Sequence, residues 1–517
     1  MNRARVIYQI ARADFLERVR RYSFLVMLGA VVFLGYQAAI GNINVQVGNY
    51  RGEYNSAWVG SMMAIIASFF LGWFGFYLVK GSVGRDRETG VGQIMATTPL
   101  TRPLYTFGKW ISNFTVLVAM VIVLAIVGVG IQFFAGESSQ FDFLALFSPF
   151  LFIALPMLAL TAAFAVLFEC VGFLRGGFGN IVYLFLFSFT LPLTVSISES
   201  NPALEPLGLN LLQQSMGEAA KAAFPDYDGS FVLGSADIPI TGVFAWPGVD
   251  WTLDIVLQRF MFFGIAIFLT LLSSLLFDRF DAARSKGGRR KSSAPLSTPE
   301  TVPVTQSLSA VRLTPLDAPS RECAFTRVLS LELRLLLKGQ RWWWFAVAGG
   351  LLIAAFLFPA EAVRSYLLPI TWLWPVLIWS GLGSREMRHN TQQMVFSAAA
   401  PLARQLPAAW LAGFLVAALT GSGAALRLLS AGDGAGLLAW FSAALFIPSL
   451  ALALGIWSNS PKLFEVLYVS LWYLAINKVF AVDFYGASGD GNIGFFIPLS
   501  LVLIITAFIG RARQIQN

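Results

Sequence analysis

Charged residues are scarce in this sequence of 517 residues: Asp, Glu, Lys and Arg make up 12%, against 57% hydrophobic residues. Soluble domains carry roughly 25% charged residues, so the composition excludes a chain built from several soluble globular domains. It also leaves little room for a large soluble catalytic domain. The mean hydropathy of +0.69 instead predicts an all-α integral membrane protein.

Cysteine and histidine are almost absent. Only Cys170, Cys323 and His389 occur, and the topology inferred below places both cysteines on the cytoplasmic side. A disulfide framework is therefore excluded, and one histidine cannot build a His-rich metal cluster. We expect no metal site, and we expect His389 to be a solvated surface residue.

A phosphate-binding loop is missing as well. The pattern G-x-x-x-x-G-K-[ST] does not occur, and the stretch from Gly84 to Gly90 lacks the Lys-Ser/Thr pair that such a loop requires. The chain is therefore predicted not to hydrolyse ATP and to bind no cofactor of its own. No span combines the titratable partners of a catalytic cluster either, which argues against a membrane-embedded enzyme.

Long apolar runs are what the sequence has instead. A membrane-crossing helix needs about 20 apolar residues, and twelve runs approach this length. They cover residues 22–40, 57–79, 111–134, 143–168, 178–197, 255–277, 342–358, 366–381, 407–428, 434–457, 463–481 and 493–510. We predict about twelve transmembrane helices, of which the run at 366–381 is the shortest.

The basic residues indicate the orientation of these spans. Twelve spans place both termini on one side, and thirty of the 36 Lys and Arg residues fall on that side. Because basic residues accumulate on the cytoplasmic side, both termini are predicted to be cytoplasmic, in the cytoplasmic membrane of a bacterium. The same rule accounts for the net charge of +8, so no nucleic-acid partner is implied. Arg259 and Lys478 lie near the outer ends of their spans, where we expect them to snorkel to the interface.

Two halves of six spans each are predicted, at residues 1–277 and 321–517. Residues 278–320 are rich in Ser, Pro, Lys and Arg and lack the apolar content to fold alone, so they read as a flexible basic linker. At an offset of 302 residues the halves share identities: Thr89, Ala96, Pro99, Leu100, Arg102 and Leu104 coincide with Thr391, Ala398, Pro401, Leu402, Arg404 and Leu406. We infer a tandem duplication.

A segment with helical amphipathicity precedes each half. In the first, Val6, Ile10, Ala13 and Leu16 share one face and arginines occupy the other, which predicts a helix lying in the membrane interface. Residues 325–341 repeat this pattern less cleanly. For that second segment, a simple extension of the seventh span explains the sequence equally well.

The connection between the second and third spans carries the most specific pattern. It reads Gly84-Arg-Asp-Arg-Glu-Thr-Gly90, then Pro99-Leu-Thr-Arg102, then Gly108-Lys109 at the start of the next span. Here the sequence resembles the membrane subunits of ATP-binding cassette (ABC) exporters of the type-2 family. Their pattern in this place is an acidic residue with Gly/Thr, a short helix, a Pro followed by Thr/Ser and Arg, and a Gly-Lys pair. The resemblance covers the first half in order.

The resemblance implies a function and a partner. In that family a separate ATPase subunit, with its ATP and Mg, supplies the energy, and the short helix docks in a groove of that subunit. The chain would then be the permease of an ABC exporter working by alternating access, with two ATPase copies beneath it. The residues given this ATPase-coupling role, with the charged ones as ion-pair partners of the ATPase, are Arg85, Asp86, Arg87, Glu88, Thr89, Gly90, Pro99, Thr101, Arg102, Gly108 and Lys109, and in the second half Arg385, Glu386, Arg388, Thr391, Pro401 and Arg404.

The second half departs from the family pattern. It keeps the Arg/Glu start, the Thr and the Pro-Leu-x-Arg turn, but it has no equivalent of Gly90 or of the Gly-Lys pair. This departure favours an asymmetric pair of coupling segments. For both segments there is an alternative to ATPase coupling. The charged residues would then only reflect the cytoplasmic position of these loops and keep them solvated.

A long segment, residues 198–254, is predicted to lie outside the membrane between the fifth and sixth spans. Prolines divide it, and residues 207–223 have the pattern of an amphipathic helix. By the resemblance, this region would hold helices that dip back toward the bilayer and close the pathway. An ordinary loop outside the membrane fits the sequence equally, and the counterpart near residues 483–492 is much shorter.

The spans themselves say little about the cargo. Ionisable residues within them are scarce, which argues against proton- or sodium-coupled transport. With 46 Phe and 15 Trp, the pathway is predicted to suit a hydrophobic, amphipathic or peptide-like cargo, although lipid-facing Phe explains the same counts. Two alternatives stay open: a non-transporting membrane scaffold, and a major-facilitator carrier, whose G-x-x-x-D-R-x-G-R loop does not match at Arg85.

Overall fold

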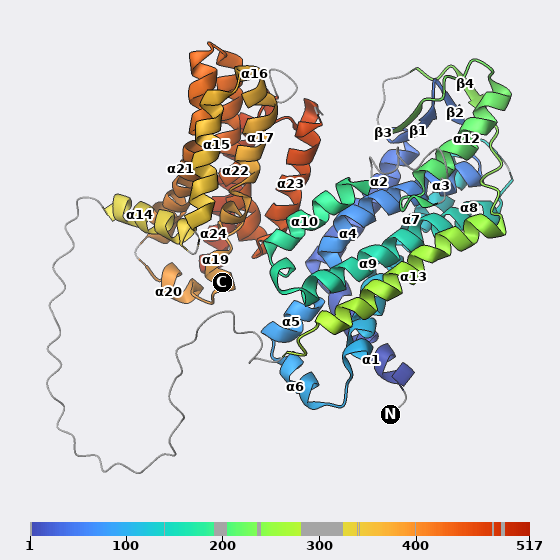
Figure 1. The fold of residues 1–517 in the computed structure, drawn as a ribbon, viewed down its shortest axis with the longest axis horizontal. Helices are drawn as coiled ribbons and strands as arrows, with labels where there is room; N and C mark the ends of the chain where they lie inside the picture. Colours follow the sequence, from blue (N-terminus) through green and yellow to red (C-terminus); the bar gives the residue numbers. More distant parts are fainter. Residues whose placement is uncertain are drawn as a thin grey trace. The chain divides into compact units, whose positions relative to one another are not determined.

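The computed structural model describes residues 3–138, 140–190, 204–234, 239–280, 324–338, 340, 342–398, 400–477, 480–486 and 492–516. These residues are mostly α-helical, as predicted, and they belong to two compact units, Met1–Ala282 and Ala283–Asn517 (Figure 1). Nearly all of the predicted linker, and with it Cys323, lies outside the described residues, as does Lys478.

The first unit starts with two helices that meet at an angle. Helices α1 (Arg3–Val19) and α2 (Tyr22–Ala39) are bent by 75° with respect to each other. Helix α1 packs on α7 (Arg102–Ala135), and a Cβ added at Gly108 would lie 3.1 Å from Ile10 Cγ2. The predicted apolar face of α1 is thus divided, because Ile10 faces α7 whereas Ala13 and Leu16 are exposed.

The remaining helices of the first unit follow the predicted runs. They are α3 (Ser56–Ile66), η1 (Ala67–Leu71), α4 (Gly72–Val79), α5 (Ser82–Glu88), α6 (Val91–Thr97), α7, α8 (Phe143–Pro149), η2 (Phe150–Ala154), α9 (Leu155–Cys170), η3 (Gly172–Leu174), α10 (Gly177–Ser188) and α13 (Leu253–Leu276). Helix α9 lies at the centre, against α4, α7 and α13, and nearly all of its residues are buried. Its alanines at 159, 162, 163 and 165 allow this close approach, as small residues do between membrane helices.

A small mixed domain, here called the cap, closes one end of the first unit. Strands β1 (Asn44–Val47), β2 (Tyr50–Gly52), β3 (Phe231–Gly234) and β4 (Gly242–Phe244) form one sheet in the order β3-β1-β2-β4. Strand β1 is antiparallel to β2 and β3, and β2 is parallel to β4. Helix α12 (Leu209–Ala223) packs on β1 and β4, so the predicted helix at 207–223 exists. The sheet was not predicted.

The second unit repeats the helical plan without such a cap among its described residues. Its elements are α14 (Ala324–Leu337), α15 (Trp342–Leu357), α16 (Ala360–Ala362), η5 (Val363–Leu367), α17 (Leu368–Leu373), α18 (Val376–Trp379), α19 (Arg385–Arg388), α20 (Gln392–Phe396), α21 (Pro401–Ser430), α22 (Gly434–Ser458), α23 (Lys462–Ile476), η6 (Phe480–Val482) and α24 (Ile493–Gln516). The shortest predicted run, 366–381, is broken between α17 and α18. Pro375 stands at this break, because proline has no N–H to continue the helix.

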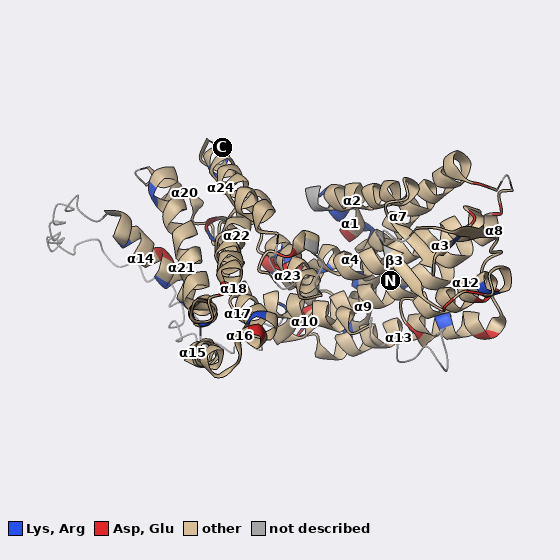
Figure 2. Cartoon of the chain, turned by 90° about the horizontal axis from the view of Figure 1, so that it is seen from above, with Lys and Arg blue, Asp and Glu red and all other residues tan. Residues whose placement is uncertain are grey.

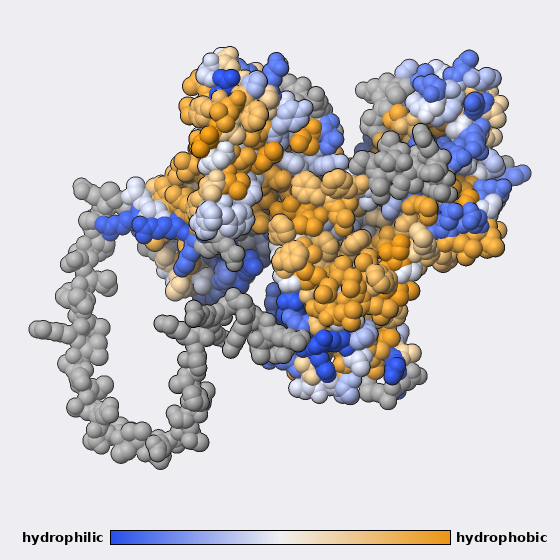
Figure 3. All heavy atoms as spheres, viewed as in Figure 1, coloured by the Kyte–Doolittle hydropathy of each residue, from blue (hydrophilic) through white to orange (hydrophobic). Residues whose placement is uncertain are grey.

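Seven helices in the described part of the chain are long and apolar enough to cross a membrane, and eight if α1 and α2 count as one broken span. The seven are Ser56–Glu88, Arg102–Ala135, Phe143–Cys170, Leu253–Leu276, Pro401–Ser430, Gly434–Ser458 and Ile493–Gln516. Figure 3 shows an apolar surface over the middle of the first unit, with hydrophilic surface at the cap and around α5 and α6. An integral membrane protein is therefore confirmed, and the number twelve stays a prediction.

Charged residues are few along the helices, as Figure 2 shows, and the side chain of one of them contradicts its predicted placement. Arg259 on α13 does not snorkel to the surface, because its side chain is fully buried. Its Nε donates to Phe152 O at 2.8 Å, and its guanidinium also donates to the carbonyls of Glu205 and Pro206. Arg259, near the amino end of α13, thus holds the residues that lead into α12.

Candidate functional site

The connection between the predicted second and third spans folds as two short helices, α5 and α6. Gly81 and Gly90 have φ angles of 119° and 75°, which glycine adopts without the penalty of a side chain, and each directly precedes one of these helices. After α6 the backbone is extended at Thr98 and at Thr101, before α7 begins with Pro103 in its first turn. Glycine and proline therefore fix where the two helices start and stop.

A buried cluster of charges holds α5 to α1 and α7. Lys109 Nζ lies 2.7 Å from carboxylate oxygens of both Asp14 and Asp86, and Tyr105 donates its hydroxyl to Asp86 at 2.7 Å. Arg85 pairs with Asp14 at 2.7 Å and also with Glu17. These ion pairs join α5 to α1 and α7. Moving α5 away would leave buried charges unpaired, which is energetically costly.

Helix α9 also holds the start of α5. Glu169 accepts hydrogen bonds from Val83 N at 2.9 Å, from Ser82 Oγ at 3.0 Å and from Gly84 N at 3.4 Å. A carboxylate in this place satisfies free N–H groups of the first helical turn and interacts favourably with the helix dipole. Nearby, Lys80 Nζ donates to Asn180 Oδ1 at 2.7 Å, which ties the end of α4 to α10.

Arg87 forms a third attachment, to Asp278, the second residue after α13. Its Nη2 lies 2.6 Å from Asp278, which Arg175 also approaches to 3.1 Å. Burial alone would raise the pKa of Asp278, but the two guanidinium groups outweigh this effect and hold the pKa below the ordinary aspartate value. Arg85, Asp86 and Arg87 therefore all have partners inside the chain.

Other predicted residues of this segment face outward. Among them Glu88, Thr89, Pro99 and Thr101 are exposed, as are the neighbouring Thr97 and Thr98. The apolar side chains of Ile94 and Val91 on α6 are 68% and 39% exposed. Sequence reasoning did not single out Ile94, although an apolar residue on a short helix between charged loops was a visible signal. Arg102 is half-buried, and its predicted role as an ion-pair partner of an ATPase stays a prediction, as does that of Glu88.

The second unit contains a similar pair of short helices, α19 and α20. Arg385 on α19 lies 2.5 Å from Glu332 of α14. Glu386 is buried, accepts from Gln405 Nε2 at 2.7 Å, and lies 3.2 Å from Arg511 of α24. Burial would raise the pKa of Glu386, but Arg511 and Arg385 outweigh it and lower the pKa.

The two segments correspond more closely than predicted, at an offset of 300 rather than 302. Helix α5 ends at residue 88 and α19 at residue 388, so Arg85-Asp86 corresponds to Arg385-Glu386. Gly90 also has an equivalent: Asn390 has a φ of 53°, and asparagine tolerates this left-handed conformation better than most residues. Arg511 supplies the cation that Lys109 supplies in the first unit, from a helix that no local pattern could indicate.

The other predicted residues of the second segment lie around α20. Arg388 and Arg404 are exposed, and Pro401 is the first residue of α21. The N–H of Thr391 donates to Glu386 O at 2.9 Å. On α20, Met394 is 73% exposed and stands where Ile94 stands in the first unit. Among the described residues, no group of three or more Cys, His, Asp or Glu is placed to hold a metal.

Comparison with known proteins finds a similarity within the first unit. Residues 8–175 match the family model described as ABC-2 family transporter protein. No curated protein and no solved structure matches the chain. The match spans about a third of the sequence, from α1 to the residue that follows η3, and includes α5, α6 and the buried charge cluster. The resemblance seen in the sequence is thereby confirmed for residues 8–175, which are similar to ABC type-2 permeases.

Proposed function

We propose that the chain is the permease subunit of an ATP-driven ABC exporter, and that α6 is the helix on which a separate ATPase subunit docks. The observation that carries this proposal is the contrast between the two short helices. Helix α5 is tied into the permease by buried charges, whereas α6 presents Ile94 and Val91 to the surface. An exposed apolar surface on α6, next to a helix that is fixed in the permease, suits a protein interface.

This geometry supports a path along which force would pass from α6 into the permease. Force applied to α6 reaches α5 directly, because the two helices are in contact. From α5 it passes to α1, α7 and α9 through Arg85, Asp86 and Glu169. Closure of the ATPase would therefore tilt these helices as one group and reopen the bundle toward the outside, which is alternating access.

The second unit supports a weaker version of the same contact. Helix α20 has five residues against seven in α6, and its one strongly exposed apolar side chain is Met394. Arg511 lies over the ring of Phe396, 4.9 Å from its centre, and this contact joins α20 to α24. We propose two ATPase copies, of which the one beneath α6 is coupled more strongly, and a hydrophobic, amphipathic or peptide-like cargo.

The test is to isolate the wild-type chain gently from its native membrane and to identify co-purifying proteins by mass spectrometry. Ile94→Glu places a charge at the centre of the predicted interface, where a loss of roughly 2 kcal/mol is typical of a hot spot. We expect a cassette ATPase with the wild type and at least tenfold less of it with Ile94→Glu.

Val243→Glu is the matched control, because Val243 on β4 of the cap is similarly exposed (45%) but lies far from α6 in the fold of the first unit (Figure 1). It should retain the wild-type amount of ATPase. If no cassette ATPase accompanies the wild type even after crosslinking, the chain is a scaffold or a secondary carrier instead. The family match over residues 8–175 favours the permease.

A further inference from the structure

Residues 278–280, shortly after α13, contact both short helices, α5 and α6. Asp278 pairs with Arg87 on α5, as described above. Arg279 Nη2 donates to Thr98 O at 3.0 Å and to Ala96 O at 3.4 Å. A cation in this position satisfies free carbonyls at the carboxyl end of a helix and opposes their negative charge.

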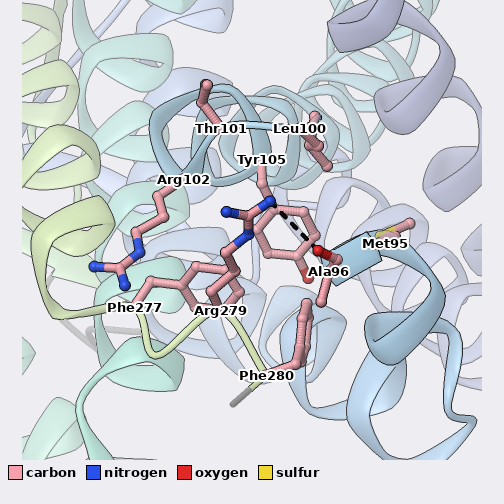
Figure 4. A pocket seen from close by; sticks show the side chains of 9 residues that line it. All are labelled: Met95, Ala96, Leu100, Thr101, Arg102, Tyr105, Phe277, Arg279 and Phe280. Atoms are coloured by element: carbon pink, nitrogen blue, oxygen red, sulfur yellow. Dashed lines mark hydrogen bonds between the residues drawn. The ribbon is translucent and has the colours of Figure 1, made fainter. Parts of the chain in front are cut away.

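Phe280 supplies the apolar part of the same contact. Gly92 is the one buried residue of α6, and the atoms nearest to a Cβ added there all belong to the Phe280 ring, the first at 2.5 Å. Phe277 stacks on Tyr105 of α7, with ring centres 4.9 Å apart. Figure 4 shows Arg279 reaching from the end of α13 toward Ala96, beside a small pocket between α6, the start of α7 and residues 277–280.

The backbone of this segment is strained. Arg279 and Phe280 have φ angles of 49° and 61°, a region that is unfavourable for a residue with a side chain. Two such residues in succession persist only where surrounding contacts fix them, and this kind of strain is concentrated at functional sites. Here the fixing contacts are the hydrogen bonds of Arg279 to α6 and the packing of Phe280 on Gly92.

We infer that residues 278–280 are positioning residues which transmit the movement of α6 to α13, the last helix of the first unit. The inference rests on the proposed docking of an ATPase on α6. Two routes then leave the docking helix: through α5 to α1, α7 and α9, and through Arg279 and Phe280 to α13. Because Gly92, the one buried residue of α6, packs on the Phe280 ring, movement of α6 should pull on the end of α13.

The first arm of the test uses the full chain in lipid nanodiscs and needs no ATPase. Hydrogen exchange of residues 91–98 is compared in wild type, Arg279→Ala, Phe280→Ala and Arg279→Lys, with Arg12→Ala, an exposed arginine of α1, as control. We expect the two alanine variants to exchange about tenfold faster, which corresponds to about 1.4 kcal/mol. Arg279→Lys should recover part of this protection, because lysine still donates to Thr98 O. Unchanged rates in both alanine variants overturn the inference.

The second arm uses the complex that co-purifies with the chain. In wild type, ATP should change the exchange rates of α13. In Arg279→Ala the amount of bound ATPase should stay within twofold of wild type while the ATP-dependent change in α13 is lost.

The outcomes of this arm separate the two proposals. If Arg279→Ala keeps the ATP-dependent change, α13 is driven by another route and this inference alone fails. If the variant loses the ATPase itself, Arg279 belongs to the docking surface and is not a positioning residue. If wild type brings no ATPase, the proposed function fails, and this inference fails with it.

Discussion

Lys109 lies between two carboxylates, with its Nζ 2.7 Å from Asp14 and from Asp86, and its side chain is fully buried. The sequence predicted this lysine as part of a Gly-Lys pair, by resemblance. It could not predict the partners, because Asp14 is 95 residues away on α1 and the contact depends on how α1 packs across α7. The same holds for Arg85 and Arg87, which the structure pairs within the chain.

Removal of this buried cation should destabilise the protein strongly. Lys109→Met leaves Asp14 and Asp86 without their shared partner, and breaking a buried ion pair typically costs about 3–5 kcal/mol. We expect a marked fall in the midpoint of thermal unfolding in detergent. Lys221→Met, at an exposed lysine of α12, should stay near wild type. Equal stability of the two variants would contradict the buried cluster.

Asp278 gives a pH-dependent test of the same kind of contact. Its pKa is lower in the folded chain than in the unfolded one, so its ion pairs with Arg87 and Arg175 stabilise the fold above the ordinary aspartate pKa, about 4. This contribution is lost as the pH falls through the lowered native value. Asp278→Asn should therefore cost about 1 kcal/mol at pH 7, a modest value because the pair is partly exposed.

The measurement is the difference in unfolding midpoint between wild type and Asp278→Asn across the pH range. The difference should be largest near neutral pH and should disappear well below pH 4, about the ordinary aspartate pKa, where both side chains are uncharged. A difference that grows toward acid would show that Asp278 is not held as a carboxylate by the two arginines.

At the scale of elements, the helices were predictable and their breaks were not. Apolar runs indicated the positions of the long helices, because length and hydropathy are local properties. The sheet of the cap was missed because it pairs β1 and β2, between the first two spans, with β3 and β4, nearly 200 residues later. Its strands have three or four residues, which is too short for an alternating pattern to be recognised.

The packing of α1 on α7 can be tested at Gly108. A Cβ at this position would lie 3.1 Å from Ile10 Cγ2, so Gly108→Leu should push α1 away and weaken the contact between Asp14 and Lys109. Overpacking of this kind costs about 1–3 kcal/mol. The expected readouts are a lower unfolding midpoint and faster hydrogen exchange in α1.

Gly130→Leu controls for the change in helix propensity. Gly130 lies on the same helix, α7, and no atom lies within 4 Å of an added Cβ. This variant should unfold at or above the wild-type temperature. A loss of stability in Gly130→Leu equal to that in Gly108→Leu would mean that the contact with Ile10 is not what the glycine protects.

At the scale of the whole molecule, the two units share contacts that support a duplication. Each unit has a short helix, α5 or α19, in which an arginine is followed directly by an acidic residue. This arginine pairs with a carboxylate of α1 in the first unit and of α14 in the second. Each unit also contains an ion pair between an arginine and a carboxylate far apart in the sequence: Arg51 with Glu137 in the first unit, and Arg364 with Asp433 in the second. The cap remains specific to the first unit among the described residues, which agrees with the asymmetry seen in the sequence.

The predicted orientation is testable with single cysteines in a Cys170→Ser/Cys323→Ser background. Thr97→Cys on α6 should react with a membrane-impermeant maleimide only after the inner face is opened. Asp228→Cys in the cap should react in intact cells. Labelling of both positions from the same side would contradict the placement of α6 in the cytoplasm and of the cap outside.

The most direct test of the central claim is a photocrosslink from α6. A photoreactive phenylalanine analogue replaces Ile94, the native membrane is irradiated, and the adduct is identified by mass spectrometry, with the same analogue at Val243 as control. We predict a covalent adduct with a cassette ATPase from position 94 and none from position 243. Adducts from position 94 that contain only lipid or other membrane proteins would contradict the docking of an ATPase on α6.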